Sequence, residues 1–181
     1  NLYLHVNYYG DVIEFWYPPD HEGTLTVTES DGVTVKATVD FTTTSIPWWN
    51  GDTGFSTDLD GVVWDPERPD IQAGDWVFGE VDVDGTIYSA EVQLGEILGE
   101  VDAENDSITG TIYVPWLPQG VEIEMQCHPW GAPNPTDGKQ DFVLPDGEDP
   151  YFCEWDPDTE WDIQPYSDVG VTYTDPSGHW V

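Results

Sequence analysis

Apolar and polar residues alternate along much of this chain with a period of two, which is typical of β-strands with one buried face. The clearest example is a pair of segments, Thr24–Thr28 and Val33–Phe41, on either side of a Ser-Asp-Gly turn. Glycine can adopt positive φ in such a turn, so the two segments predict a β-hairpin. Asp75–Val83 and Thr86–Leu94 flank an Asp-Val-Asp-Gly turn in the same way and predict a second hairpin.

The alternation continues toward both ends of the chain, with Gly and Pro between the segments. No segment combines helical periodicity with caps, so the crossover helices of a parallel βαβ fold are not expected. Many short strands separated by turn residues predict an all-β fold built from sandwiches. Further strands are expected at Leu2–Val6, Val12–Tyr17, Ile97–Val101, Val121–Met125 and Val169–Tyr173.

Two short motifs occur twice in the same order, which indicates an internal duplication. We therefore expect two tandem, immunoglobulin-like β-sandwich units, at residues 1–96 and 97–181. In each motif Asp can cap a turn, Pro fixes φ and Trp can pack, so we expect a scaffold rather than a site. Ile112 and Val114 match Ile13 and Phe15 at an offset of 99. The repeated triplets are Trp64-Asp65-Pro66 with Trp155-Asp156-Pro157, and Asp70-Ile71-Gln72 with Asp162-Ile163-Gln164.

The charge is extreme: 37 acidic residues face 3 basic ones in 181 residues, for a formal net charge of −34. Nucleic acid and anionic membranes need a basic face, so neither is an expected partner. Three interpretations remain open: a high-salt environment that screens the repulsion, an extracellular setting rich in divalent cations, or calcium held by a few clusters. Disorder is not expected, because ten Trp and nine Tyr are interleaved with the acids.

Cys127 and Cys153 each adjoin a strand-like segment and predict a disulfide, with two free buried thiols as the alternative. A disulfide points to an oxidising compartment, hence to an extracellular or cell-surface protein. No signal peptide is visible and the first residue, Asn1, is not Met, so a mature or trimmed form is expected. No apolar run approaches the length of a membrane span, and membrane insertion is not expected.

Acidic turns are the candidate metal sites, because calcium binds carboxylate and carbonyl oxygens at such bends. None fits an EF-hand loop, and Asp-Gly turns are also ordinary hairpin chemistry, so calcium is a possible cofactor but not a required one. Asn105-Asp106-Ser107 also matches an N-glycosylation acceptor. The candidate ligands are Asp58, Asp60, Asp82, Asp84, Asp102, Glu104 and Asp106.

Tryptophans in loops or near the chain end could stack on sugar rings, or could anchor the cores of small β-domains. Those expected to bind carbohydrate are Trp48, Trp49, Trp130 and Trp161, and Trp180 lies near the end. No nucleophile elbow or zinc-binding helix motif occurs, so we do not expect an enzyme. A secreted hydrolase with paired carboxylates is a further alternative, since a glycosidase needs only two acids at a set separation.

The repeated motifs give the chain a family resemblance. With its Trp-Asp-Pro and Asp-Ile-Gln segments, it resembles uncharacterised secreted or cell-surface bacterial proteins built from repeated β-rich units. The resemblance implies an extracellular setting and no particular activity.

The leading functional hypothesis is an extracellular structural protein, a subunit of a filament, stalk or surface layer that self-associates through β-strand edges. The segment with Leu2, Leu4 and Val6 is the candidate donor strand. The last hairpin lacks a full return strand after its Asp-Pro-Ser-Gly turn, which would leave an edge open. The alternative is a carbohydrate-binding or adhesive module with exposed Trp residues and a glycan partner.

Overall fold

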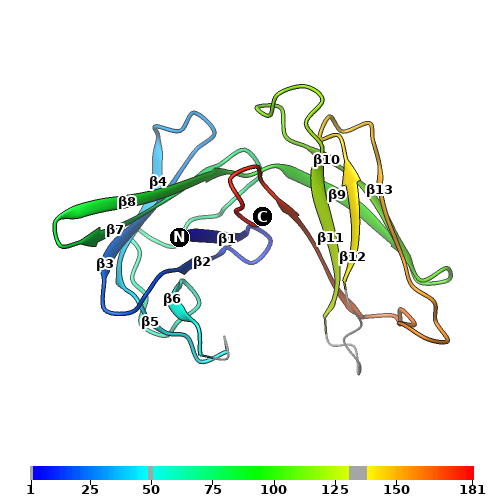
Figure 1. Cartoon of the computed structure of the whole chain (residues 1–181), viewed down its shortest axis with the longest axis horizontal. Helices are drawn as coiled ribbons and strands as arrows, with labels where there is room; N and C mark the ends of the chain where they lie inside the picture. The colour runs from blue at the N-terminus through cyan, green and yellow to red at the C-terminus, as the bar shows by residue number, and fades with distance from the viewer. Residues whose placement is uncertain (1, 49–50, 131–137) are drawn as a thin grey trace. The chain divides into compact units, whose positions relative to one another are not determined.

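The chain forms β-strands and connections in a computed structural model that describes residues 2–48, 51–130 and 138–181 (Figure 1). No helix occurs in these ranges, and every paired strand is antiparallel, so the all-β prediction is confirmed. The strands are β1 (Tyr3–Asn7), β2 (Val12–Trp16), β3 (Glu22–Thr28), β4 (Val35–Thr42), β5 (Thr44–Ser45), β6 (Thr53–Ser56), β7 (Trp76–Val83), β8 (Thr86–Gln93), β9 (Glu96–Asp102), β10 (Ser107–Tyr113), β11 (Ile123–Trp130), β12 (Lys139–Val143), β13 (Tyr151–Glu154) and β14 (Asp168–Thr174).

The chain divides into two compact, sandwich-like units, and the division falls after Leu94 rather than after residue 96. The first unit also contains Gly178–Val181, which the sequence placed in the second. These last residues lie beside β1. The N–H of Val6 donates to the carbonyl of Trp180 at 2.9 Å, and the N–H of Trp180 donates to the carbonyl of Leu4 at 3.0 Å. The predicted span 97–181 is therefore corrected at its end.

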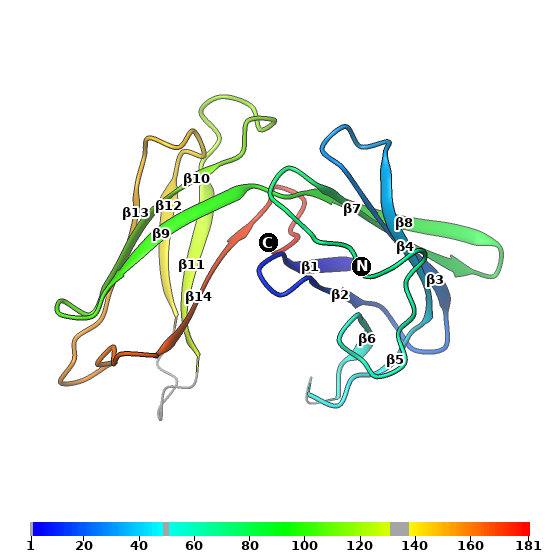
Figure 2. The ribbon, with the colours of Figure 1, turned by 180° about the vertical axis from the view of Figure 1, so that it is seen from behind.

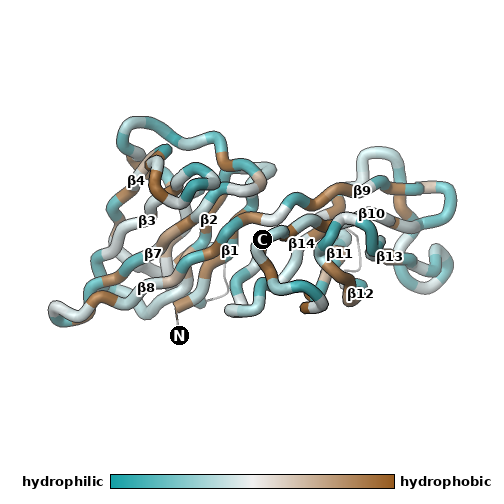
Figure 3. The backbone as a smooth tube through the Cα atoms, turned by 90° about the horizontal axis from the view of Figure 1, so that it is seen from above, coloured by the Kyte–Doolittle hydropathy of each residue, from teal (hydrophilic) through white to brown (hydrophobic). Residues whose placement is uncertain are grey.

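In the first unit, two four-stranded sheets have the strand orders β1-β2-β6-β5 and β4-β3-β7-β8. Both predicted hairpins are present: β3 pairs with β4, and β7 pairs with β8. Every second residue is buried along much of β2, β4 and β7, and hydrophobic and hydrophilic segments are interspersed along the tube of this unit (Figure 3). Phe41 stacks on Phe55 with ring centroids 4.5 Å apart, and both rings are buried in the core of this unit.

The second unit repeats this plan with two three-stranded sheets, β13-β10-β9 and β12-β11-β14 (Figure 2). Strand order makes β9, β10 and β13 the counterparts of β1, β2 and β6. In the same way β12, β11 and β14 correspond to β4, β3 and β7. In the described part of the second unit, β5 and β8 have no counterpart.

The duplication is visible at the level of single side chains, and it corrects the offset of 99. Asp11 and Asp106 lie in the turn between the first two strands of their units, with φ of 53° and 50°. Each carboxylate accepts a hydrogen bond from the isoleucine N–H of an Asp-Ile-Gln triplet. These aspartates are 95 positions apart, so the match of Ile112 with Ile13 was wrong. Apolar positions recur every second residue in strands, so an apolar match alone leaves the register ambiguous.

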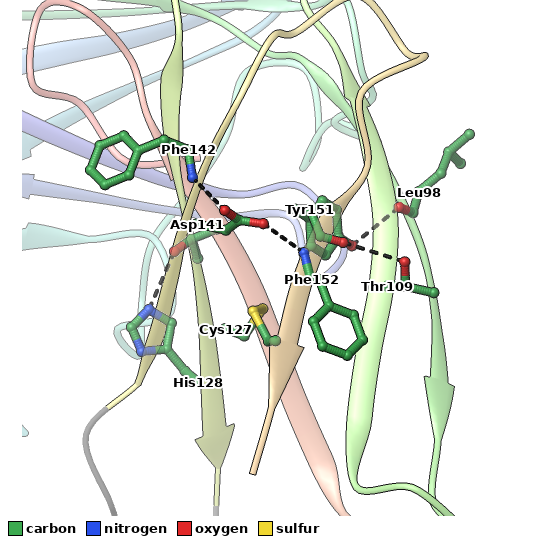
Figure 4. The surroundings of a disulfide bond; sticks show 10 residues. Leu98, Thr109, Cys127, His128, Asp141, Phe142, Tyr151 and Phe152 are labelled. Carbon is green, nitrogen blue, oxygen red and sulfur yellow. Dashed lines mark hydrogen bonds between the residues drawn. A yellow bond between two sulfur atoms is a disulfide. The ribbon is translucent and has the colours of Figure 1, made fainter.

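A disulfide joins Cys127 on β11 to Cys153 on β13, which confirms the predicted bond and rules out the free thiols (Figure 4). Because β11 and β13 belong to different sheets, the bond connects the two layers of the second unit. Asp141 on β12 adds a polar connection, since its Oδ2 accepts a hydrogen bond from the N–H of Phe152 on β13 at 2.8 Å. Both connections end on β13, which is an edge strand of its sheet.

Candidate functional site

The outer face of β1 and β2 carries a concentration of aromatic side chains. The antiparallel register places Tyr3 opposite Trp16 and His5 opposite Glu14. Their neighbours in sequence, such as Leu4 and Phe15, are fully buried, so alternation directs these four side chains away from the core. We call this surface the aromatic patch; its members are Tyr3, His5, Glu14, Trp16, Trp48 and Trp180.

Trp180 enters the aromatic patch from the C-terminal segment. The two backbone hydrogen bonds beside β1 hold it there, and His179 and Val181 on either side of it are buried. The Trp180 ring lies 5.9 Å from Tyr3 and 6.0 Å from His5, measured between centroids, with nearly perpendicular planes. Segments from opposite ends of the sequence therefore build one surface.

Glu14 is the polar centre of the patch. Its Oε2 lies 3.0 Å from Nδ1 of His5, and its Oε1 accepts a hydrogen bond from Nε1 of Trp48 at 3.3 Å. The side chains of His5 and Glu14 are 21% and 16% exposed, so both keep some contact with solvent. A carboxylate and an imidazole beside aromatic rings can accept and donate hydrogen bonds to a polar ligand that stacks on the rings.

Two of the tryptophans present substantial ring surface to solvent: Trp48 is 50% exposed and Trp180 is 38% exposed. Tyr3 and Trp16 are half-buried and pack edge to face, with centroids 5.3 Å apart. Such contacts fix the rings relative to one another. Ring contacts thus position Tyr3, Trp16 and Trp180, and the hydrogen bond to Glu14 positions Trp48. Trp48 and Trp180 are the two most exposed rings of the patch.

The four tryptophans predicted to bind carbohydrate lie in different environments. Trp48 belongs to the aromatic patch. Trp161 is only 6% exposed and packs edge to face on Trp155 at 5.2 Å, so its prediction as a sugar-stacking ring is wrong and it anchors the core instead. Trp49 and the side chain of Trp130 lie outside the described residues.

Sequence reasoning missed Tyr3, His5, Glu14 and Trp16 as site residues, although a signal was present. The alternation of Leu2, Leu4 and Val6 defines the strand, and Tyr3 and His5 between them lie on its other face. An aromatic or titratable residue at every second position indicates a polar-aromatic outer face. Glu14-x-Trp16 on the neighbouring strand repeats that pattern.

The candidate donor strand, β1, is built into the sheet and core of the first unit. Leu4 and Val6 are fully buried, and β1 has β2 on one side and Trp180 on the other. The prediction that Leu2, Leu4 and Val6 are available to another chain is therefore corrected. The side chains of Leu4 and Val6 fill the core from which a donor strand would have to be withdrawn, and Leu2 is half-buried.

The residues of the repeated motifs hold their units together. Trp64 and Trp155 are buried, as are Ile71 and Ile163. The other members make local contacts: Asp65 exchanges two backbone hydrogen bonds with Thr38, and the N–H groups of Gln72 and Gln164 donate to the side chains of Asp75 and Ser167. Pro66, Asp70, Pro157 and Asp162 are exposed next to these contacts.

Several of the acidic residues predicted as metal ligands cap turns. Asp82 accepts a hydrogen bond from the N–H of Gly85, and Asp102 accepts bonds from Glu104 and Asn105. The Asn105 side-chain amide, followed by those two N–H groups, lowers the pKa of Asp102. Asp106, by contrast, is buried. Asp58, Asp60, Asp84 and Glu104 are not buried.

Among the described residues, no group of three or more His, Cys, Asp or Glu side chains is arranged to hold a metal ion. Calcium binding stays a prediction without a defined site. A hollow of about 600 Å³ on the sheet β4-β3-β7-β8 is lined by several carboxylates, including Glu22, Asp40 and Glu80. Thr24 donates a hydrogen bond to Asp40 there at 2.8 Å. This hollow is where the hydrolase alternative could be tested.

Comparison with known proteins does not assign the chain to a family. No protein-family model matches the chain, and no curated protein matches it. No helix in the part of the chain that the structure describes is long and apolar enough to cross a membrane.

Proposed function

We propose that this protein is an extracellular carbohydrate-binding or adhesive module, and that the aromatic patch is its binding surface. One observation carries the proposal: four aromatic rings and the His5–Glu14 pair lie together on the outer face of one sheet. Aromatic side chains are normally buried in cores, so a cluster of them around a carboxylate at the surface favours a ligand.

Sugar rings suit this combination of groups. The C–H faces of a pyranose can stack on indole rings such as those of Trp48 and Trp180, and the hydroxyl groups can donate to the Glu14 carboxylate. The Tyr3 ring already contacts Trp16 and Trp180, and Trp48 is hydrogen-bonded to Glu14, so little side-chain freedom would be lost on binding.

The charge of the chain narrows the class of carbohydrate. With a formal net charge of −34, the protein repels polyanionic glycans at low ionic strength. We therefore propose a neutral or amino-substituted saccharide as the ligand. The extracellular location is part of this proposal, and the disulfide between Cys127 and Cys153 is compatible with it.

The experiment is a screen of the wild-type protein against a glycan array, followed by titration calorimetry with the best neutral or amino-substituted binder. Trp48→Ala and Trp180→Ala should each weaken binding by at least about tenfold, equivalent to about 1.4 kcal/mol. Trp76→Ala is the matched control, because Trp76 is a half-buried aromatic residue on the other sheet, stacked on Phe78.

Two results would refute the proposal. One is the absence of binding across the array by a folded wild-type protein. The other is an equal loss of affinity in Trp76→Ala and in the two patch variants, because it would show that the ligand does not recognise the aromatic patch. The structural-subunit hypothesis stays a separate prediction, and it requires a strand edge other than that of β1.

A further inference from the structure

β14 is an edge strand of its sheet, whereas its counterpart in the first unit, β7, lies between two strands. β7 pairs with β3 on one side and with β8 on the other, over eight residue pairs in the second case. Among the described strands, β14 pairs with β11 alone and is the last strand of its sheet. After the turn that follows β14, the chain runs to β1 instead of returning along β14.

The missing neighbour leaves part of the second core open. In the first unit, Val77 and Val81 on β7 are fully buried, and Val92 on β8 is buried beside them. At the matching positions on β14, Tyr173 is buried as Val81 is, but Val169, the counterpart of Val77, is partly exposed, and so is Val171 between them. Apolar side chains that a neighbouring strand would cover therefore contact water at this edge.

This edge also lacks the charged side chains that commonly discourage pairing. Natural edge strands are commonly shielded by charged side chains, bulges or covering segments. From Val169 to Thr174, β14 contains no charged residue, in a chain with 37 acids. The edge strand β9, by comparison, contains Glu96, Glu100 and Asp102, and β1 is covered by Trp180.

We infer that the outer edge of β14 pairs with β14 of a second copy of this chain, in antiparallel orientation about a two-fold axis at Val171. Two identical strands can pair in antiparallel orientation about a two-fold axis, so the same edge serves as the interface on both copies. In this register Asp168 faces Thr174 of the other copy, and no two charged side chains face each other. The two three-stranded sheets would become one continuous six-stranded sheet.

The two-fold arrangement closes on itself, so it produces a dimer rather than a filament. It retains the self-association through strand edges that the sequence suggested, but with β14 in place of Leu2–Val6. Two chains with a net charge of −34 repel each other, so pairing should strengthen with salt as the repulsion is screened. The inference is independent of the carbohydrate proposal, because β14 and the aromatic patch share no residue.

The test is the molar mass of the intact protein, measured by sedimentation or light scattering from low to molar salt over a range of protein concentrations. We expect a shift from one chain to two as salt rises. Val171→Asp and Val171→Lys should each abolish the shift, because the symmetric register places like charges directly opposite each other. An equimolar mixture of the two variants should restore a dimer, and Val171→Thr is the uncharged control.

Hydrogen exchange of wild-type β14 amides provides a second readout that needs no variant. Protection that rises with protein concentration at high salt supports the pairing, even if a charged variant does not fold. A wild-type chain that stays monomeric with unchanged β14 exchange in molar salt would overturn the inference. A dimer that survives in the folded Val171→Asp and Val171→Lys variants would do the same, since it must use another surface.

Discussion

The carboxylate of Asp106 accepts a hydrogen bond from the backbone N–H of Ile163 at 2.6 Å, and the two residues are 57 positions apart. Asp11 accepts the equivalent bond from Ile71 at 2.8 Å in the first unit. Ile163 and Ile71 are both buried, so their N–H groups need an acceptor inside the protein. The Asp-Ile-Gln repeat therefore marks where each long loop is fastened to the turn between its first two strands.

Replacing Asp106 by Ala should lower the free energy of unfolding of the second unit by about 2 kcal/mol, the range expected for a hydrogen bond to a charged group. Asp106→Asn should cost less, because Asn tolerates the positive φ and retains an acceptor oxygen. Urea unfolding would measure both. The exposed Asp60→Ala is the control, and an equal effect of all three substitutions would contradict the role assigned to Asp106.

A second prediction concerns pH. A hydrogen bond from Lys139 Nζ, 2.6 Å from Glu160 Oε1, is the largest cause of the lowered pKa of Glu160, and the N–H of Asp156 adds to it. Lys139→Met should therefore raise the pKa of Glu160 toward its ordinary value of 4.5. An NMR titration of the carboxyl carbons would measure the change, with Lys36→Met as the control.

The sign of the stability effect follows from linkage. A carboxyl whose pKa is lower in the folded state stabilises the protein above its unfolded pKa, and that contribution is lost as pH falls through the folded pKa. The wild-type protein should thus lose the Glu160 contribution below about pH 4.5, while Lys139→Met should lack most of it at neutral pH. An unchanged Glu160 titration in Lys139→Met would contradict the assignment.

Much of the fold could be predicted from the sequence because the signals are local. The hairpin of β3 and β4 follows from alternation and a Gly-containing turn. The disulfide follows from two cysteines next to strands. Long-range relationships have no such local signal. The burial of Trp161 depends on its packing against Trp155, and the use of Leu4 and Val6 in their own core depends on β2.

The candidate site was harder to predict, for a related reason. Trp48 could be named because its loop is aromatic and polar. Trp180 contributes only because its segment pairs with β1, which lies at the other end of the sequence. The offset between the two units, expected as 99 and found as 95, shows the same limit. Period-two patterns match at several offsets, and only the Asp106 hydrogen bond identifies the true one.

The disulfide should stabilise the second unit selectively. Cys127 and Cys153 enclose a segment with a sequence separation of 26, for which loop entropy predicts roughly 3 kcal/mol. The double substitution to Ala should lower the free energy of unfolding of the second unit by that amount, measured as a lower urea midpoint, and leave the first unit unchanged. Backbone NMR signals would separate the two transitions. Equal destabilisation of both units would contradict the assignment of the bond to one unit.

Lys36 is one of three basic residues, and its ion pair is largely buried. Its Nζ lies 2.7 Å from Oδ2 of Asp75, and the two side chains are 20% and 8% exposed. Lys36→Met would leave the Asp75 carboxylate without its cation, which should cost about 3 kcal/mol. Arg68→Met is the control, because Arg68 is exposed and lies 4.0 Å from Asp58. Similar small losses in the two variants would show that the Lys36 pair is solvated.

Glu14→Gln tests whether the charge at the centre of the aromatic patch contributes to binding. The amide preserves the shape of the side chain, but one of its terminal groups becomes a donor, so it cannot accept bonds from both His5 and Trp48. A charged acceptor binds a hydroxyl about twice as strongly as a neutral one. Saccharide affinity should therefore fall by about tenfold, or about 1.4 kcal/mol, in calorimetry.

The folded state provides the control for that substitution. Glu14→Gln should retain the wild-type circular dichroism, because Ile13 and Phe15 on either side of it still fill the core. Trp48 fluorescence should shift as its indole N–H loses the carboxylate. If affinity stayed at the wild-type level while the Trp48 signal changed, Glu14 would be a residue that only positions Trp48, and stacking on the rings would account for the binding.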